Sequence, residues 1–235
     1  MTKPFANKTA LITGSTSGLG RALAVNMAEQ GAHIIALGRT VGALEELDDQ
    51  IKQSGGQATL VPLDLTELET IDPLGPTLFQ RFEKLDYFIS SAAYLGGLAP
   101  IPHYKTAEWD KVITTNLTAN FSLIRTLHPL LERSENGTAC FISDNSEDNR
   151  GTAYWGPYSA SKAGLETLAQ SYAAECKTTS IKALTIIPGP MPTPLRRKAY
   201  PGEDTSHLEG TTAIAKKITT LLGTNHYENG DQIKL

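Results

Sequence analysis

The stretch Thr13-Gly-Ser-Thr-Ser-Gly-Leu-Gly20 separates a short apolar run, Lys8–Thr13, from a segment with helical periodicity. Apolar residues recur in that segment at helical spacing, at Leu23, Ala24, Met27 and Ala28. A strand, a glycine-rich turn and a helix in this order form the phosphate-binding start of a dinucleotide-binding fold, because glycines let the backbone turn tightly beside a pyrophosphate. The helix N-terminus adds N–H donors and a positive dipole end. The stretch therefore predicts a bound dinucleotide rather than a plain strand-to-helix turn.

The rest of the chain alternates between strand-like and helix-like segments. The predicted strands after the first are His33–Leu37, Ala58–Pro62, Leu85–Ser90, Thr138–Ser143, Lys182–Ile187 and Gln232–Leu235. The predicted helices after the first are Val41–Ser54, a segment beginning near Pro76, Thr106–Arg133 with an interruption or kink at Pro129, Tyr158–Cys176 and Ala213–Leu222. This order predicts an α/β fold, a Rossmann-like doubly wound parallel sheet of about seven strands with helices on both faces. We see no linker and expect a single domain over residues 1–235.

Composition excludes several classes of protein. The chain has 235 residues, 40% of them hydrophobic and 20% charged, which is typical of a globular domain. Its net charge of -4 argues against a nucleic-acid or anionic membrane surface as partner, and no apolar run is long enough to span a bilayer. Cys140 and Cys176 lack metal-binding or redox spacing and are expected to be buried, in a reducing cytoplasm. No metal site is predicted.

Chemistry-bearing residues follow several of the predicted strands. In a parallel sheet of this kind the ligand lies beyond the carboxyl ends of the strands, so Gly14, Asp64, Ser91 and Pro188 should meet at one cleft. About twenty residues after the glycine turn, an acidic residue would bind the ribose hydroxyl of NAD, whereas an arginine accommodates the 2′-phosphate of NADP. Arg39 stands there, directly after the second predicted strand, and no acid does. We therefore predict NADP(H) in preference to NAD(H).

Tyr158 and Lys162 lie four residues apart at the start of a predicted helix. Side chains at this spacing share a helix face, so the phenol and the ammonium should point the same way. A cation near a phenol favours the phenolate and lowers its pKa, which would let Tyr158 exchange a proton near neutral pH. The spacing alone also occurs by chance on ordinary helices.

Taken together, these motifs resemble the short-chain dehydrogenase/reductase family in its standard single-domain form, over nearly the whole chain. Thr13–Gly20 looks like the TGxxxGxG turn, Tyr158-Ser-Ala-Ser-Lys162 matches YxxxK, and Pro188-Gly-Pro-Met-Pro-Thr193 resembles PGxxxT. Asp64 matches the residue that contacts the adenine ring, and Asn116 matches the catalytic asparagine. The resemblance implies a cofactor site made by Gly14, Ser15, Ser17, Gly18, Leu19, Gly20, Arg39, Asp64, Leu65, Ser91, Ala92, Tyr158, Lys162, Pro188, Gly189 and Thr193.

The resemblance also implies hydride transfer between the nicotinamide and a carbonyl or alcohol substrate. Tyr158 would be the general acid or base, Lys162 would lower its pKa and hold the nicotinamide ribose, and Asn116 would help carry the proton to solvent. Family members of this kind commonly pair the two helices Thr106–Arg133 and Tyr158–Cys176 across a two-fold axis, so a homodimer or homotetramer is expected.

The chain departs from the family pattern in two places. The family's Asn-Asn-Ala-Gly turn is Ser90-Ser91-Ala92-Ala93 here. The family's catalytic serine, thirteen residues before the tyrosine, is Asn145. Asparagine carries N–H donors that could polarise the substrate oxygen in its place, and Ser146 is an alternative donor. The other reading is a catalytically impaired NADP(H)-binding sensor or scaffold of the same fold.

The substrate side is less specified by the sequence. Apolar and aromatic candidates for the pocket wall are Tyr94, Leu95, Leu98, Ile101, Tyr154, Trp155 and Met191. The polar, proline-rich segment Met191–Gly210 could form a mobile lid. Its basic residues Arg196, Arg197 and Lys198 could meet an anionic substrate, and the acidic run Asp144-Asn-Ser-Glu-Asp148 could disfavour one, but solvated surface charge is the better-supported reading of both. No substrate class follows from these opposed charges.

Overall fold

A seven-stranded parallel sheet forms the centre of the protein. The computed structural model describes residues 3–144 and 151–235. Strands run in the order β3-β2-β1-β4-β5-β6-β7, and each neighbouring pair is parallel. The strands are β1 Thr9–Thr13, β2 His33–Gly38, β3 Gln57–Pro62, β4 Tyr87–Ser90, β5 Thr138–Ile142, β6 Lys182–Ile187 and β7 Gln232–Lys234. The strand order reverses between β1 and β4, as it does in a doubly wound sheet. The predicted fold class is confirmed.

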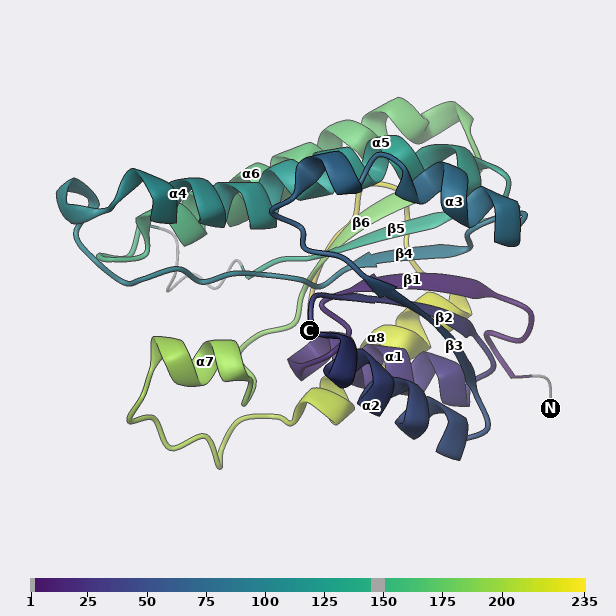
Figure 1. The fold of residues 1–235 in the computed structure, drawn as a ribbon, viewed down its shortest axis with the longest axis horizontal. Coiled ribbons are helices and arrows are strands. Elements are labelled where there is room, and N and C mark those ends of the chain that lie inside the picture. Colours follow the sequence, from purple (N-terminus) through teal and green to yellow (C-terminus); the bar gives the residue numbers. More distant parts are fainter. Residues whose placement is uncertain (1–2, 145–150) are drawn as a thin grey trace.

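Helices cover both faces of this sheet. Figure 1 shows α1, α2 and α8 on one side and α3 to α6 on the other, with α7 apart from both layers. The helices are α1 Gly18–Glu29, α2 Val41–Gln53, α3 Leu74–Arg81, α4 Thr106–Ile113, α5 Ala119–Glu132, α6 Gly156–Glu175, α7 Pro194–Ala199 and α8 Thr211–Thr224. Short 3₁₀ turns add Leu68–Thr70, Ile101–His103 and Cys176–Thr178. In the described residues no helix is both long and apolar enough to cross a membrane.

Two apolar layers hold the helices to the sheet. On one face Leu23 and Met27 of α1 pack with Ile218 and Leu222 of α8 beneath the strands. On the other face, residues of α5 and α6 such as Leu127 form a separate layer. Each of these side chains is fully buried, and burying a leucine or isoleucine stabilises the fold by about 1.5–3 kcal/mol. Cys140 and Cys176 lie in these layers as free, buried thiols, as predicted.

The long predicted helix Thr106–Arg133 is interrupted, but not at Pro129. Helix α5 runs through Pro129 to Glu132, so the interruption predicted there is wrong, and the alternative of a kink stays a prediction. The buried Leu127, Leu130 and Leu131 outweigh the missing N–H of the proline, which costs about 3 kcal/mol in a helix interior. The interruption is a π-helical turn at Thr114–Thr118, between α4 and α5.

Two other differences concern segments with prolines. Helix α3 begins at Leu74, two residues before Pro76, because a proline in the first helical turn removes an N–H that has no partner in the helix anyway. The segment Met191–Gly210 contains the short helix α7, which starts with Pro194 directly after Thr193. The Thr193 Oγ1 accepts a hydrogen bond from the backbone N–H of Arg196 at 3.1 Å and so caps this helix.

Candidate active site

The glycine turn after β1 packs directly against the loop that follows β4. Thr13 Oγ1 accepts hydrogen bonds from the backbone N–H groups of Ser91 and Ala92, both at 3.1 Å. Gly14 has a φ of +65°, and a Cβ there would lie 2.8 Å from the Ala92 Cα. A Cβ on Gly20 would overlap the carbonyl oxygen of Gly14. The turn therefore requires glycine for sterics and for its left-handed backbone, and it leaves a groove above the N-terminus of α1.

The N-terminus of α1 lies open to this groove. Ser17, Gly18 and Leu19 line it, and α1 has no acidic residue in its first turn. Among the described residues no side chain caps this end of the helix. Its backbone N–H groups and positive dipole end are therefore available to an anionic group. Ser15 lies elsewhere, because its Oγ donates to the carbonyl of Leu37 at 3.1 Å and it is fully buried away from the cavity.

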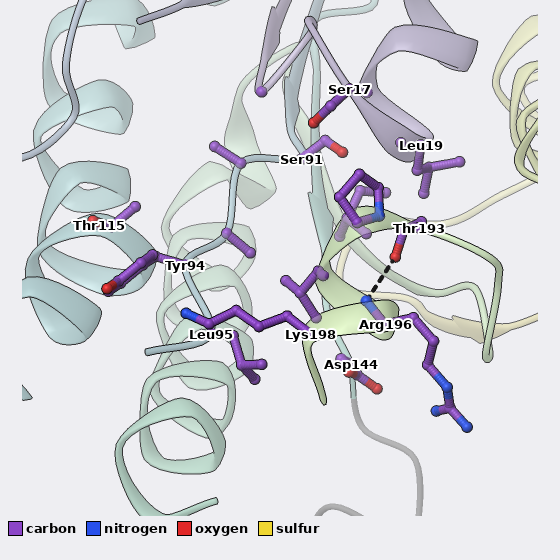
Figure 2. Close-up of a pocket in the computed structure, with 18 of the residues that line it drawn as sticks. Ser17, Leu19, Ser91, Tyr94, Leu95, Thr115, Asp144, Thr193, Arg196 and Lys198 are labelled. Atoms are coloured by element: carbon purple, nitrogen blue, oxygen red, sulfur yellow. Dashed lines mark hydrogen bonds between the residues drawn. The ribbon is translucent and has the colours of Figure 1, made fainter. Parts of the chain in front are cut away.

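One cavity of about 520 Å³ extends along the carboxyl ends of the strands. The structure brings every predicted cofactor residue except Ser15 to its wall, namely Gly14, Ser17, Gly18, Leu19, Gly20, Arg39, Asp64, Leu65, Ser91, Ala92, Tyr158, Lys162, Pro188, Gly189 and Thr193. Residues that the sequence reasoning did not select also line it, including Thr16, Lys111, Thr115, Asp144 and Tyr200. Figure 2 shows part of this wall, with Ser17, Ser91 and Thr193 around the groove.

Arg39 and Asp64 face each other at the end of the cavity near β2 and β3. Arg39 Nη1 lies 3.9 Å from Asp64 Oδ2, and the Arg39 side chain is 62% exposed. Burial by itself would raise the pKa of Asp64, but hydrogen bonds from Thr66 and the charges of Arg39 and Lys111 outweigh burial and hold that pKa below its ordinary value. This end thus offers a carboxylate that stays ionised and a guanidinium that solvent or a phosphate can reach.

The loop after β4 continues into Tyr94, whose ring contacts two lysines. Lys111 Nζ of α4 and Lys198 Nζ of α7 lie 5.0 and 5.1 Å from its ring centroid, within cation–π distance. Figure 2 shows Lys198 extending from α7 toward Tyr94 across the cavity, whereas Arg196 points away. Arg196 instead binds Glu203 through two hydrogen bonds of 2.7 and 2.6 Å. Helix α7 therefore forms part of the cavity wall.

Asn116 does not line the cavity but holds its wall. It lies fully buried in the π-helical turn. Its Oδ1 accepts from the backbone N–H of Tyr94 at 2.7 Å, and its Nδ2 donates to the Tyr94 carbonyl at 3.0 Å and to Ser161 Oγ at 2.9 Å. Ser161 Oγ in turn donates to the Tyr158 carbonyl at 2.7 Å. One amide thus connects the β4 loop to the first turn of α6.

Tyr158 and Lys162 lie at the inner end of the cavity, on the first two turns of α6. Tyr158 OH donates to Asp144 Oδ2 at 3.3 Å, and Lys162 Nζ donates to the carbonyl of Ile142 at 2.9 Å. The Lys162 ammonium lies 5.8 Å from the centroid of the Tyr158 ring. The predicted arrangement of phenol and ammonium on one helix face is therefore present.

The predicted direction of the tyrosine pKa is corrected by the structure. Burial, followed by the charge and hydrogen bond of Asp144, raises the pKa of Tyr158 well above its ordinary value. Burial also lowers the pKa of Lys162 to about 8, although Asp144 and Glu166 oppose this shift. The expectation that Lys162 lowers the Tyr158 pKa considered one neighbour and omitted both burial and Asp144. The sequence signal for Asp144, besides the acidic run that it begins, is its position two residues after the end of β5.

The predicted donors Asn145 and Ser146 lie outside the described residues. On the substrate side, Tyr94, Leu95 and Met191 line the cavity. Trp155 is buried behind Tyr158, with ring centroids 5.8 Å apart. The remaining predicted wall residues are exposed to solvent and do not line the cavity, namely Leu98, Ile101 and Tyr154.

Comparisons with known proteins match this arrangement. The family model described as short chain dehydrogenase matches residues 8–204. The uncharacterized oxidoreductase YciK of Escherichia coli K12 is 32% identical over 216 residues, which cover 91% of this chain and 85% of that protein. A short chain dehydrogenase from Shigella flexneri 2a, solved in complex with NADP, superposes with a TM-score of 0.93 at 29% identity over 100% of this chain and 99% of that one. A short chain dehydrogenase from Escherichia coli CFT073, solved in complex with NADPH, superposes with a TM-score of 0.91 at 29% identity, over 100% of this chain and 98% of that one.

These relatives share the parallel sheet and are named as dehydrogenases or oxidoreductases. The family uses a nicotinamide cofactor, and the cavity described above lies where a doubly wound sheet binds one. This chain therefore belongs to the short-chain dehydrogenase/reductase family and is an oxidoreductase acting on CH–OH and C=O groups.

Proposed function

We propose that this enzyme is an NADP(H)-dependent reductase or dehydrogenase in which Tyr158 exchanges a proton with the substrate oxygen. The observation that carries the proposal is the buried Tyr158 hydroxyl, which lies with Lys162 in the wall of the same cavity as the glycine turn. The nicotinamide, when bound, supplies or accepts the hydride. The protein supplies a binding groove, a proton donor and a site shielded from water.

The residues present fit such a cofactor. At Gly14 and Gly20 a Cβ would clash with the backbone of Ala92 and of Gly14, so glycine is required for the tight turn, and the uncapped start of α1 offers N–H donors to a pyrophosphate. Asp64 and Leu65 would hold the adenine, and Thr193 lies next to Gly18, where a Cβ would be 3.3 Å from its Cγ2. We assign Thr16 to the cofactor site in place of Ser15, because Thr16 lines the cavity and Ser15 does not.

Arg39 supports NADP(H) over NAD(H). Its side chain is mostly exposed at the cavity end, and its Nη1 lies 3.9 Å from Asp64 Oδ2, which is a long distance for an ion pair. A 2′-phosphate could therefore bind the guanidinium in place of Asp64 or together with it. The two solved relatives in complex with NADP and NADPH agree with this choice.

The cofactor preference is tested by equilibrium binding of NADPH and NADH. We expect Arg39→Ala to weaken NADPH binding about ten- to a hundredfold, the value of one charge-assisted hydrogen bond, and to leave NADH binding unchanged. Arg21→Ala is the matched control, because that side chain binds Gln50 on the outside of α1. Binding of NADH by the wild type that is as tight as that of NADPH, or tighter, contradicts the proposed preference.

Tyr158 would donate its proton to the carbonyl oxygen in reduction and accept one in oxidation. Its raised pKa keeps the phenol protonated, which is the form that reduction requires. Lys162, fixed by the Ile142 carbonyl, would hold the ribose hydroxyls of the cofactor. For Asn116 we propose a role in holding Tyr94 and Ser161, since its side chain is already engaged by both. Asn145 or Ser146 remains our proposed donor to the substrate oxygen.

Tyr158→Phe tests the proposed function. It removes only the hydroxyl, so turnover should fall by roughly 10²–10⁴-fold while NADPH binding persists. Tyr172→Phe is the matched control, because Tyr172 is another buried tyrosine of α6 but its hydroxyl pairs with His128 at 2.9 Å, outside the cavity. Retained turnover in Tyr158→Phe would remove the residue from its role. Tight NADPH binding by the wild type without turnover on ketones, aldehydes or quinones would favour the sensor or scaffold instead.

We also infer that residues 1–235 form a single domain and that the protein assembles as a dimer or tetramer. Trp109 of α4 and Phe121 of α5 are 40% and 50% exposed, which supports a covered surface on these helices. Light scattering coupled to size exclusion gives the mass in solution, and a monomer would contradict the assembly.

A further inference from the structure

In the part of the chain that the structure describes, Asp144 is the charged side chain that contacts the Tyr158 hydroxyl. It lies two residues after the end of β5, lines the cavity and accepts the phenolic hydrogen bond on Oδ2 at 3.3 Å. This distance is long for an O–H donor, whose bonds are usually 2.5–3.0 Å. The phenol is therefore oriented by the carboxylate but remains free to turn its proton toward another acceptor in the cavity.

Among the described residues, three other charged groups near this pair have partners of their own. From α6, Lys162 donates to the Ile142 carbonyl, and Glu166 accepts from Ser143 Oγ at 2.7 Å. From α7, Arg196 is held by Glu203 in a two-bond ion pair. Both cations still act on Asp144 through space, since each is affected by its charge.

We propose that Asp144 is a positioning residue of this enzyme, which aims the Tyr158 hydroxyl into the cavity and keeps it protonated, ready for carbonyl reduction. In reduction the O–H bond of Tyr158 breaks, its proton goes to the substrate oxygen and a phenolate remains until solvent returns a proton. A carboxylate beside the phenol opposes that phenolate, so it biases the resting site toward the proton-bearing form. This inference rests on the proposed role of Tyr158.

The pH dependence of NADPH-driven carbonyl reduction tests the inference. Asp144→Asn keeps the size and an acceptor oxygen but removes the charge, so the alkaline limb of kcat should move to lower pH by about one to three units. Asp144→Glu, which restores a carboxylate, should bring the limb back toward the wild type. Asp72→Asn is the charge-matched control, because this aspartate is exposed, pairs with Arg125 and does not line the cavity. An alkaline limb that stays at the wild-type pH in Asp144→Asn overturns the inference.

A second measurement does not depend on turnover. Ultraviolet difference titration of the phenolate, with the Tyr158→Phe forms of each protein subtracted, isolates the ionisation of Tyr158. Tyr158 should ionise at a lower pH in Asp144→Asn than in the wild type, and ionisation at the same or a higher pH overturns the inference. The two failures are distinguishable. Turnover retained in Tyr158→Phe defeats the proposed function, whereas a lost Tyr158→Phe activity with an unmoved Tyr158 titration defeats only the role of Asp144.

Discussion

Replacing Asn116 with alanine should cost both stability and cofactor affinity. The substitution removes three hydrogen bonds, at 2.7 and 3.0 Å to the backbone of Tyr94 and at 2.9 Å to Ser161. Ser161 keeps its own bond to the Tyr158 carbonyl, so the groups left without a partner are chiefly the N–H and C=O of Tyr94. An unsatisfied buried group costs about 1–3 kcal/mol, and Tyr94 is half-buried, so we expect a loss of roughly 3 kcal/mol.

A loss of this size is measurable by thermal and urea unfolding. In a chain of this length it corresponds to a fall in Tm of roughly 6–12 °C. NADPH binding should weaken as well, because Tyr94 and the residues before it form a wall of the cavity. Asn120→Ala is the matched control. Asn120 is also buried one turn along, but it binds Ser90 and the Asn116 carbonyl rather than Tyr94, so it should lose stability with little change in NADPH affinity.

The reasoning is refuted if Asn116→Ala unfolds within about 0.5 kcal/mol of the wild type, the range of an ordinary surface substitution. If such a variant also lost turnover, the asparagine would act in the chemistry itself. Equal effects of Asn116→Ala and Asn120→Ala on NADPH binding would likewise contradict the idea that Asn116 supports the cavity through Tyr94.

Two further outcomes are expected. Lys162 has a pKa of about 8 in the folded protein against an ordinary 10.5, so between these pH values the unfolded chain binds more protons and stability rises with pH. Lys162→Met should therefore gain stability relative to the wild type below about pH 8, with the gain shrinking up to about pH 10.5 in urea titrations; a constant difference contradicts this. Gly14→Ala should lower stability by about 1–3 kcal/mol and abolish NADPH binding, because of its φ of +65° and the contact with Ala92. Gly42→Ala, in α2 with open space around it, should instead stabilise by about 0.5–1 kcal/mol; similar results for the two glycines contradict the steric argument.

The order of strands and helices was predictable because each element has its own local signal. Buried parallel strands are continuous apolar runs, and β2, β5 and β6 were located to within a residue or so. The glycine turn was predictable because only glycine fits where the backbone approaches closely, and the structure places Gly14 and Gly20 against backbone atoms. Residues at the carboxyl ends of the strands therefore came to one cavity without any knowledge of side-chain contacts.

The missed features all depend on contacts between distant parts of the chain. The π-helical turn at Thr114–Thr118 is accompanied by bonds from Asn116 to Tyr94 and Ser161, 22 and 45 residues away, and periodicity in one segment cannot reveal them. Pro129 is a strong local signal for the end of a helix, but the burial of its neighbours stabilises the helix by more than the proline costs. Ser15 fits the motif, but its hydroxyl donates a hydrogen bond to the Leu37 carbonyl of the adjacent strand.

The proton chemistry shows the same division between local and tertiary effects. Four residues of helix place Lys162 beside Tyr158, but the direction of both pKa shifts follows from burial. Asp144, which follows another strand, adds to the shift of Tyr158 and opposes that of Lys162. Burial disfavours both the phenolate and the ammonium, so the two pKa values move apart, with the tyrosine above its ordinary value and the lysine near 8. The protonated phenol is thus the stable form across the neutral range. Since reduction uses this form and oxidation uses the phenolate, the proposed mechanism requires that oxidation gain on reduction as the pH rises.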